Sequence, residues 1–195
     1  LATELKEEPW AELAQSVNRG AMTLDARLNS ILDIALSDAG NLSIDYEDCS
    51  IKDIIDDVAR DMIPVTSYYR QSLVADIPDN LPHLKADSKR LKQVLTSFIE
   101  TAARVTPEGG IIRINARKKS GKLQVEIADT SSGLTEEQKK FLQASQPSRA
   151  GRESLRGLGF GLSLSKNIIE LHHGTMWINS EKGKGNIFGF SIPFS

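Results

Sequence analysis

Three stretches of this sequence combine residue types that could bind a ligand carrying both a phosphate and an exocyclic amine. Residues 91–105 form a polar helix face with Ser97, Glu100, Thr101 and Arg104. Residues 125–133 place Asp129 where an alternating apolar run ends and a turn of small residues begins, and a buried carboxylate there could accept a hydrogen bond from an amine. Residues 157–164 read GLGFGLSL, a glycine-rich entry to a helix, where backbone N–H groups favour anions.

Each stretch by itself has an ordinary structural explanation. A polar helix face is usually solvated, and an aspartate after a strand usually belongs to a turn. A glycine-rich stretch before a helix is often only a tight turn. Their order and spacing along one chain make them informative together, and hydrophobic periodicity shows which elements would have to position them.

Residues 10–35 show the periodicity of one long helix. Pro9 stands where a first helical turn tolerates proline, and Gly40 ends the pattern. A heptad seam of apolar or small residues runs through Trp10, Leu13, Val17, Ala21, Leu24, Leu28, Ile31 and Ala35. One helix cannot bury such a seam alone. It therefore pairs either with a second copy of the chain, in a dimerisation bundle, or with the domain that follows.

The rest of the chain predicts an α+β domain with helices on one face of a mixed sheet. Strands are expected at 42–46 and 71–77, and hairpins at 111–116 with 123–128 and at 175–179 with 187–192. The first helix starts at 51, with Ser50 as its N-cap and Pro64 as its limit. A second helix is capped by Asp87 and runs to 105, and a third covers 161–172. The segment 130–157 is expected to be a mobile loop with a short helix at 136–141.

Composition and charge exclude several function classes. The 195 residues carry a net charge of −2, which argues against nucleic acid as a partner. The basic group is interpreted as a solvated hairpin turn rather than a phosphate-binding patch, and it consists of Arg117, Lys118, Lys119 and Lys122. The single cysteine, Cys49, cannot form an internal disulfide and indicates a reducing compartment. We expect it to be an unreactive thiol, because nothing near it resembles a paired base.

No apolar run approaches the roughly 18–20 residues that span a bilayer. We therefore expect no membrane contact within this chain and a cytoplasmic location. Because the chain begins with Leu1 rather than methionine, we expect it to be part of a longer protein, in which a membrane anchor or sensor domain could lie upstream.

The sequence resembles the sensor histidine kinases of two-component systems over residues 22–195. The resembling runs are RLNSILDIALSDAGNLSIDYEDCSIKDII, RLKQVLTSFIETAARVTPEGG, ADTSSG, GLGFGLSLSKNIIELHHG and GKGNIFGFSIP. The first resembles the end of the dimerisation hairpin, and the others resemble the successive boxes of the ATP-binding domain. The tail of the dimerisation helix favours this family over its chaperone and topoisomerase relatives.

The resemblance implies a fold, a cofactor and a chemistry. Residues 1–41 would be a partial dimerisation region, and residues 42–195 an ATP-binding α/β sandwich of the histidine kinase type. Such a domain binds ATP and Mg²⁺ and presents the γ-phosphate to a histidine on the dimerisation helices. The implied partners are a second copy of the chain, through the N-terminal helix, and a response regulator receiver domain or a partner kinase.

Several residues match the family pattern position by position. Asp129 corresponds to the aspartate that reads adenine, Glu100 to an acidic position with a catalytic role, and Arg104 to a basic position near the phosphates. The glycines that match are Gly133 in the second box and Gly157, Gly159 and Gly161 after the lid. Ser97 and Thr101 stand at nucleotide-binding positions where the family normally has asparagine, and Thr101 holds the magnesium position.

The departures from the family pattern concern the binding of Mg²⁺ and ATP. Magnesium requires near-octahedral oxygen ligands, so the shorter, β-branched Thr101 is a poor substitute for asparagine. Ser131 replaces a glycine, and its Cβ would hinder a positive φ angle and any close approach to the nucleotide. Ile187 stands where a threonine often hydrogen-bonds the adenine site. The lid lacks a clear phenylalanine box, of which Phe141 would be a remnant.

None of the three histidines stands where the family's phosphoacceptor belongs. His83 is expected in a turn, and His172 and His173 at a helix C-terminus that favours positive charge. The acceptor helix lies upstream if residues 28–32 align with the end of the dimerisation hairpin. If they align with the acceptor helix itself, Met22 stands near the acceptor position.

Three functions remain open from the sequence. The first is a dimeric, pseudokinase-like signalling module with a degenerate Mg-ATP site. The second is a working autokinase fragment whose acceptor histidine lies upstream. The third is a pocket adapted to another small ligand.

Overall fold

The computed structural model describes residues 39–136, 138 and 159–194, together with residues 10, 13, 14, 17, 20, 28, 32, 33, 35 and 36. The chain divides into two compact units, Leu1–Leu42 and Ser43–Ser195. Every described position between residues 10 and 36 is helical, as expected. Of the predicted seam, Trp10, Leu13, Val17 and Leu28 are each more than half exposed, whereas residues 21, 24 and 31 lie outside the described residues. No helix among the described residues is long and apolar enough to cross a membrane.

The larger unit is built on a five-stranded sheet in the order β2-β4-β5-β7-β6. Its strands are β2 (Ser72–Asp76), β4 (Ile111–Lys119), β5 (Lys122–Asp129), β6 (Thr175–Glu181) and β7 (Gly185–Pro193). β2 runs parallel to β4, and the other neighbours are antiparallel, so the sheet is mixed. A separate antiparallel pair consists of β1 (Glu47–Ser50) and β3 (His83–Ala86).

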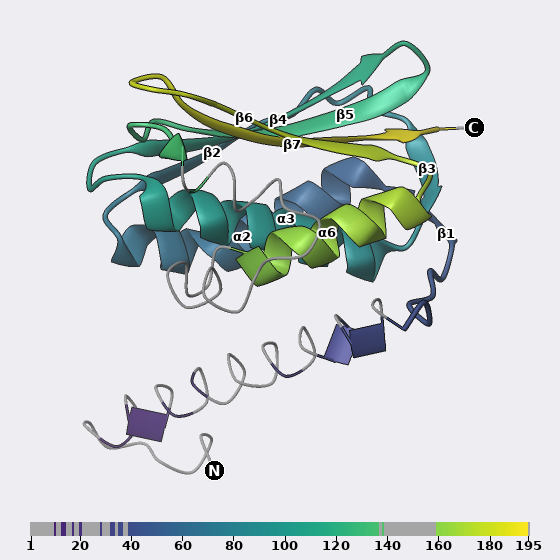
Figure 1. Ribbon diagram of the computed structural model, residues 1–195, viewed down its shortest axis with the longest axis horizontal. Coiled ribbons are helices and arrows are strands. Elements are labelled where there is room, and N and C mark those ends of the chain that lie inside the picture. The colour runs from purple at the N-terminus through teal and green to yellow at the C-terminus, as the bar shows by residue number, and fades with distance from the viewer. Residues whose placement is uncertain are drawn as a thin grey trace. The chain divides into compact units, whose positions relative to one another are not determined.

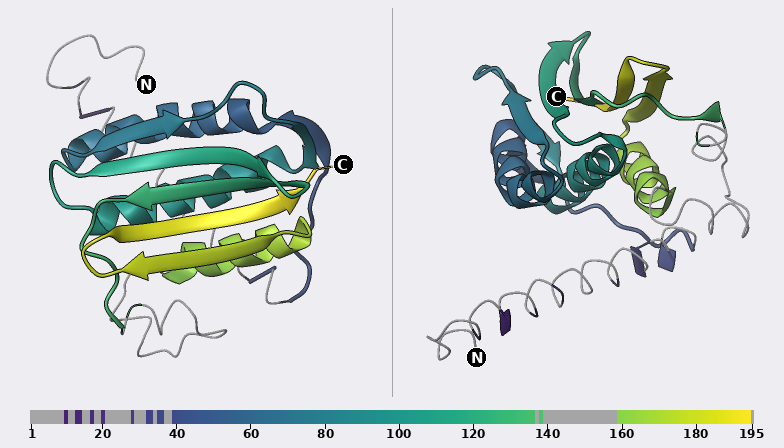
Figure 2. Two further views of the ribbon diagram at one scale, coloured as in Figure 1. Left: turned by 90° about the horizontal axis from the view of Figure 1, so that it is seen from above. Right: turned by 90° about the vertical axis from the view of Figure 1, so that its left-hand side faces the viewer.

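Three helices cover one face of this sheet (Figure 1). They are α2 (Ile51–Tyr68), α3 (Ser88–Val105) and α6 (Gly159–Leu171). α3 lies between the other two, as the right-hand view of Figure 2 shows. The Ser50 hydroxyl accepts a hydrogen bond from the Asp53 N–H (3.3 Å), and the Asp87 carboxylate accepts one from the Arg90 N–H (3.0 Å), so both predicted N-caps are confirmed. The predicted α+β sandwich is confirmed with them.

The core between the sheet and the helices follows from strand alternation. Successive side chains of a strand point to opposite faces, so every second residue of β5 and β7 faces the helices. These inward residues are Leu123, Val125 and Ile127 on β5 and Phe188, Phe190 and Ile192 on β7, all buried. Phe98 of α3 packs against them, with ring centroids 6.0 Å from Phe188 and 6.3 Å from Phe190. This aromatic cluster fixes the middle of α3 against the sheet.

The first strand lies later in the chain than the sequence predicted. Residues 42–46 are not a strand, and β1 begins at Glu47. Its partner is β3, which starts at His83, a residue expected in a turn. Cys49 faces Leu84 across the pair, and both side chains are buried. Both strands are only four residues long, so their alternation is too short to be distinguished from a turn.

Pro64 does not limit α2, which continues to Tyr68. The proline ring stands at an exposed position, while Met62 and Thr66 are buried on the inner face. The Thr66 hydroxyl also donates to the carbonyl of Ile63 at 3.1 Å. Packing of the inner face therefore offsets the lost backbone hydrogen bond of the proline.

The predicted loop after β5 is described only in part. Thr135 and Gln138 form a reciprocal cap, in which each backbone N–H donates to the side chain of the other, at 2.8 and 3.2 Å. Glu136 and Gln138 are helical, in agreement with the short helix expected there. Phe141 and the rest of this segment as far as residue 158 lie outside the described residues.

Two further residue groups have structural roles. The basic residues 117–122 lie on the exposed β4–β5 hairpin, where Arg117 pairs with Glu126 at 3.1 Å, as expected of a solvated turn. Cys49 is buried, and burial raises the pKa of its thiol, with the charge of Glu47 acting in the same direction. A raised thiol pKa disfavours the reactive thiolate.

We predict that Phe98→Ala destabilises the domain by about 3–5 kcal/mol, because it removes a fully buried ring from the aromatic cluster. Urea unfolding followed by circular dichroism measures the change. The matched control is Tyr68→Ala at the end of α2, where the side chain is 82% exposed and the change should stay within about 0.5 kcal/mol. Equal effects of the two substitutions would contradict the assigned core.

Candidate nucleotide-binding site

Asp129 lies at the end of β5, where its carboxylate accepts hydrogen bonds from two neighbouring residues. Its side chain is buried, with 4% exposed. Oδ1 accepts from the N–H groups of Ser131 (2.9 Å) and Asn186 (3.2 Å), and Oδ2 accepts from the Asn186 side-chain amide (2.9 Å). A carboxylate can accept about four hydrogen bonds, so Oδ2 keeps an acceptor position for an exocyclic amine. The predicted role of Asp129 is compatible with this geometry.

Asn186 is a site residue that the sequence reasoning missed. Besides Asp129, its amide donates to the Ser131 hydroxyl (2.8 Å), and its Oδ1 accepts from the Leu134 N–H (3.1 Å). The β5–β7 register pairs Ala128 with Ile187, which places Asn186 opposite Asp129. The sequence did contain a signal for it, because Asn186 lies two residues before Phe188 on β7 and their side chains therefore point to the same inner face of the sheet.

Ile187 lies beside Asn186 on β7 and is not the residue that hydrogen-bonds Asp129 there. As the neighbour of Asn186 on a strand, it points to the sheet face opposite the helices. The residue in contact with Asp129 is one position earlier than the sequence reasoning placed it. Asparagine offers both a donor and an acceptor there, so hydrogen bonding is retained at this end of the site.

The turn after Asp129 accommodates Ser131 without backbone strain. Ser131 does not have a positive φ, so the expected clash of its Cβ is absent. Its hydroxyl instead accepts from the Gly133 N–H at 3.2 Å. The residue that needs glycine is Gly133, with φ +85°, because a Cβ there would lie 2.7 Å from the Glu181 carbonyl oxygen. Gly185 is needed for a similar reason, because its Cβ would overlap the Asp129 carbonyl.

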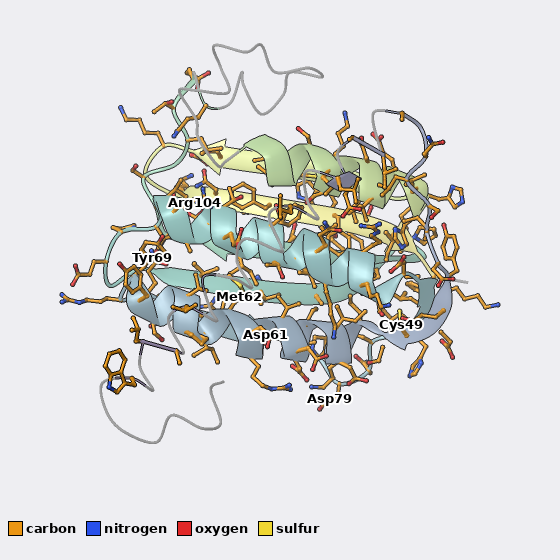
Figure 3. All side chains as sticks on the ribbon, turned by 90° about the horizontal axis from the view of Figure 1, so that it is seen from below. Cys49, Asp61, Met62, Tyr69, Asp79 and Arg104 are labelled. Carbon is orange, nitrogen blue, oxygen red and sulfur yellow. The ribbon has the colours of Figure 1, made fainter. Side chains whose placement is uncertain are left out.

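The polar residues of α3 are exposed to different extents. Thr101 is buried, and its hydroxyl donates to the Ser97 carbonyl one turn earlier at 2.7 Å. Ser97 is half-buried and touches Gly161 near the start of α6, where a Cβ would collide with the serine hydroxyl. Glu100 and Arg104 are exposed, and Figure 3 shows Arg104 near the C-terminal end of α3. The structure thus brings together two of the predicted residues, Ser97 of α3 and Gly161 of α6.

The predicted lid glycines are described only in part. Gly159 is the first residue of α6, two positions before Gly161. Gly157 lies outside the described residues. The predicted residues therefore form two groups, one at the β5–β7 strand ends and one on α3 with the first turn of α6.

The residues suit the adenine half of a nucleotide better than its metal ion. Asp129 is a buried carboxylate with a remaining acceptor position, which fits an exocyclic amine. The Thr101 side chain is buried and its hydroxyl lies back against the Ser97 carbonyl, so its oxygen does not extend from the helix as a magnesium ligand requires. Among the residues that the structure describes, no three His, Cys, Asp or Glu side chains are grouped to bind a metal ion.

The histidines stand apart from this site. His83 lies on β3, with Nδ1 3.5 Å from the Asp48 carboxylate, and His173 follows α6 with a φ of +57°. His172 was expected at a helix C-terminus that favours positive charge, and it does follow the last residue of α6, but it is buried and desolvation lowers its pKa, so the neutral ring is favoured. The expectation of a cationic helix end is wrong for this residue because the ring points into the protein.

The chain belongs to the family described as histidine kinase-, DNA gyrase B-, and HSP90-like ATPase, whose profile matches residues 86–195. The adaptive-response sensory kinase SasA of Synechococcus sp. strain JA-3-3Ab is 28% identical over 183 residues, which is 93% of this chain. The chain spans about half the length of that relative (48%). The domain is thus an ATP-binding domain of the sensor histidine kinase type.

Solved structures share the fold. Full-length ShkA in complex with AMPPNP superposes with a TM-score of 0.76 and 23% identity, over 98% of this chain and 40% of ShkA. The histidine kinase ThkA in complex with the response regulator protein TrrA gives a TM-score of 0.62 and 19% identity, over 100% of this chain and 55% of the other. At these identities the similarity supports the fold.

We predict that Gly133→Ala destabilises the domain more than Gly183→Ala. Both glycines have positive φ angles, +85° and +80°, so alanine is strained by roughly 1–2 kcal/mol at either position. Only at Gly133 would the new methyl group also meet backbone, at Glu181, whereas Gly183 faces open space. Urea midpoints of the two variants give the comparison. Equal destabilisation would show that the turn after Asp129 is not packed as described.

Proposed function

We propose that this chain is the catalytic region of a two-component sensor kinase that binds an adenine nucleotide but binds the accompanying magnesium ion poorly. The protein would then act mainly as a dimeric, pseudokinase-like signalling module. The observation that carries the proposal is the burial of the Thr101 hydroxyl and its hydrogen bond to the Ser97 carbonyl, at the magnesium position of the family.

The chemical consequence follows from how phosphoryl transfer is catalysed. The reaction depends on positioning and on neutralising the charge that develops on the phosphate oxygens. Glu100 and Arg104 are exposed on the same helix, and Arg104 could offset part of the phosphate charge. An arginine supplies positive charge but not the metal coordination that magnesium would supply, so slow transfer is expected beside measurable nucleotide binding.

Two partners are proposed. The exposed apolar residues of the N-terminal helix, with their heptad spacing, favour a second copy of the chain. A response regulator is the other partner, by analogy with ThkA, whose structure contains the response regulator protein TrrA. A dimer of the chain would also fit a cytoplasmic signalling role.

A working autokinase is the second candidate function. The buried Asp129 carboxylate is compatible with it, because an autokinase must bind the adenine ring and Oδ2 keeps an acceptor position for an exocyclic amine. In that case the acceptor histidine belongs to a part of the protein outside residues 1–195, and Glu100 supplies the missing magnesium ligand.

We predict that ATP stabilises the chain nearly equally with and without Mg²⁺, and that Thr101→Asn restores a magnesium-dependent gain. Binding at about one hundred times Kd contributes about 2.7 kcal/mol, which raises Tm by roughly 5–10 °C for a domain of this size. Thermal unfolding without ligand, with ATP and with ATP plus Mg²⁺ measures the Tm shift caused by the nucleotide and the further shift caused by the metal ion. In the Thr101→Asn variant, Tm should be higher with ATP plus Mg²⁺ than with ATP alone, because the asparagine carbonyl reaches further from the helix than a threonine hydroxyl.

The control is Thr101→Val, which keeps the shape but removes the oxygen. It should bind ATP as the unmodified chain does, with no magnesium effect. A large magnesium-dependent shift in the unmodified chain would reject the degenerate site and favour the autokinase. Absence of any shift with millimolar ATP would reject nucleotide binding altogether.

A further inference from the structure

His172 is held by two backbone groups that together require a neutral ring. Nδ1 lies 2.8 Å from the Ile168 carbonyl, which can only accept a hydrogen bond. Nε2 lies 3.0 Å from the Asp87 N–H, which can only donate. The ring must therefore carry its proton on Nδ1 and present a lone pair at Nε2. A second proton would set an N–H against an N–H and leave the buried Asp87 amide without its acceptor.

Segment 43–46 is attached to the domain beside His172. The Tyr46 ring meets the His172 ring edge-on, with centroids 5.6 Å apart, and the Tyr46 hydroxyl donates to the Leu171 carbonyl at 2.8 Å. The Asp45 N–H donates to Oδ2 of Asp87 at 3.0 Å. Three contacts thus attach this segment to the end of α6 and to the N-cap of α3. Residues 43–46 are also the stretch that leads from the unit Leu1–Leu42 into β1.

We propose that His172 is the centre of a pH-sensitive latch, which holds segment 43–46 on the nucleotide-binding domain while the ring is neutral and releases it when the ring is protonated. Both helices that carry the candidate site meet at this latch. α3 starts directly after Asp87, and α6 ends at Leu171. His172 acts as a positioning residue, because it holds segment 43–46 against the N-cap of α3 and the end of α6. The proposal holds whether or not the domain binds magnesium.

Among the residues that the structure describes, three titratable groups face the His172 ring. Asp87 faces it from the N-cap of α3, Tyr46 from segment 43–46, and His173 from the turn after α6. The Cys49 thiol on β1 contacts the carbonyl of Ala86, the residue before Asp87. Burial lowers the pKa of His172 most strongly, the Ile168 hydrogen bond and the Asp87 charge raise it, and His173 lowers it further.

The direction of the pH effect follows from the lowered pKa. Above the ordinary value of 6.5, the ring is neutral in both the folded and unfolded chain, so the latch contributes fully. As pH falls below 6.5, the unfolded chain takes up the proton first and the contribution of the latch declines. Once the pH passes the lowered folded-state pKa, the folded ring is protonated as well and the latch opens.

The test is an NMR titration of the whole chain between about pH 8 and about pH 5, which spans the histidine range. Ring signals of His172 and amide signals of Asp45 and Tyr46 are followed together. We expect one common midpoint below 6.5 for all three residues. A His172 midpoint at or above 6.5 would overturn the latch, as would Asp45 and Tyr46 signals that do not follow the His172 titration.

Two variants separate a latch from a merely buried histidine. Tyr46→Ala removes the ring contact with His172 and the hydrogen bond to the Leu171 carbonyl. Because the Tyr46 side chain is 48% exposed, the core stays intact. The His172 midpoint should then move upward toward 6.5, because the ring gains access to water. An unchanged midpoint would contradict the proposal. The matched control is His83→Asn, at an exposed histidine of β3 that is not among the groups acting on His172, and it should leave the common midpoint of His172, Asp45 and Tyr46 within experimental error.

Discussion

Burial of the Asp129 carboxylate is the constraint on which the candidate site depends. A charged group withdrawn from water is tolerated only if hydrogen-bond donors replace its hydration. Here the donors are two backbone N–H groups and the Asn186 amide. They reach the carboxylate because the turn after β5 folds back and because β7 begins opposite the end of β5. The same close approach requires glycine at Gly185 and Gly133, so one carboxylate accounts for residue choices in two strands and a turn.

The two halves of the site respond differently to substitution. Ser131 replaces a glycine of the family pattern, yet it adopts an ordinary backbone conformation and its hydroxyl joins the Asp129 network. Thr101 replaces an asparagine, and its hydroxyl turns back to the helix carbonyl of Ser97. The first change adds a hydrogen-bond partner, whereas the second withdraws an oxygen from the ligand side. This asymmetry is the physical basis of the proposed function, in which base recognition is kept and metal assistance is weakened.

α3 connects the two regions that have been considered separately. It starts at the N-cap Asp87, where segment 43–46 and His172 meet, and it carries Thr101 further along. Its middle is fixed by the packing of Phe98 against β7. The first turn of α3 and Thr101 therefore belong to one packed helix. A link between chain attachment and nucleotide occupancy would use this helix.

The sequence by itself determined the long elements, because their hydrophobic periods repeat often enough to be read. α3, α6, both hairpins and the N-caps at Ser50 and Asp87 were predicted correctly, as was the position of Asp129 at a strand end. Only the tertiary structure decided the rest. The short pair β1 and β3, the passage of α2 through Pro64 and the role of Asn186 depend on partners far away in the chain. The charge state of His172 was likewise set by burial between two helix ends, which no local pattern records.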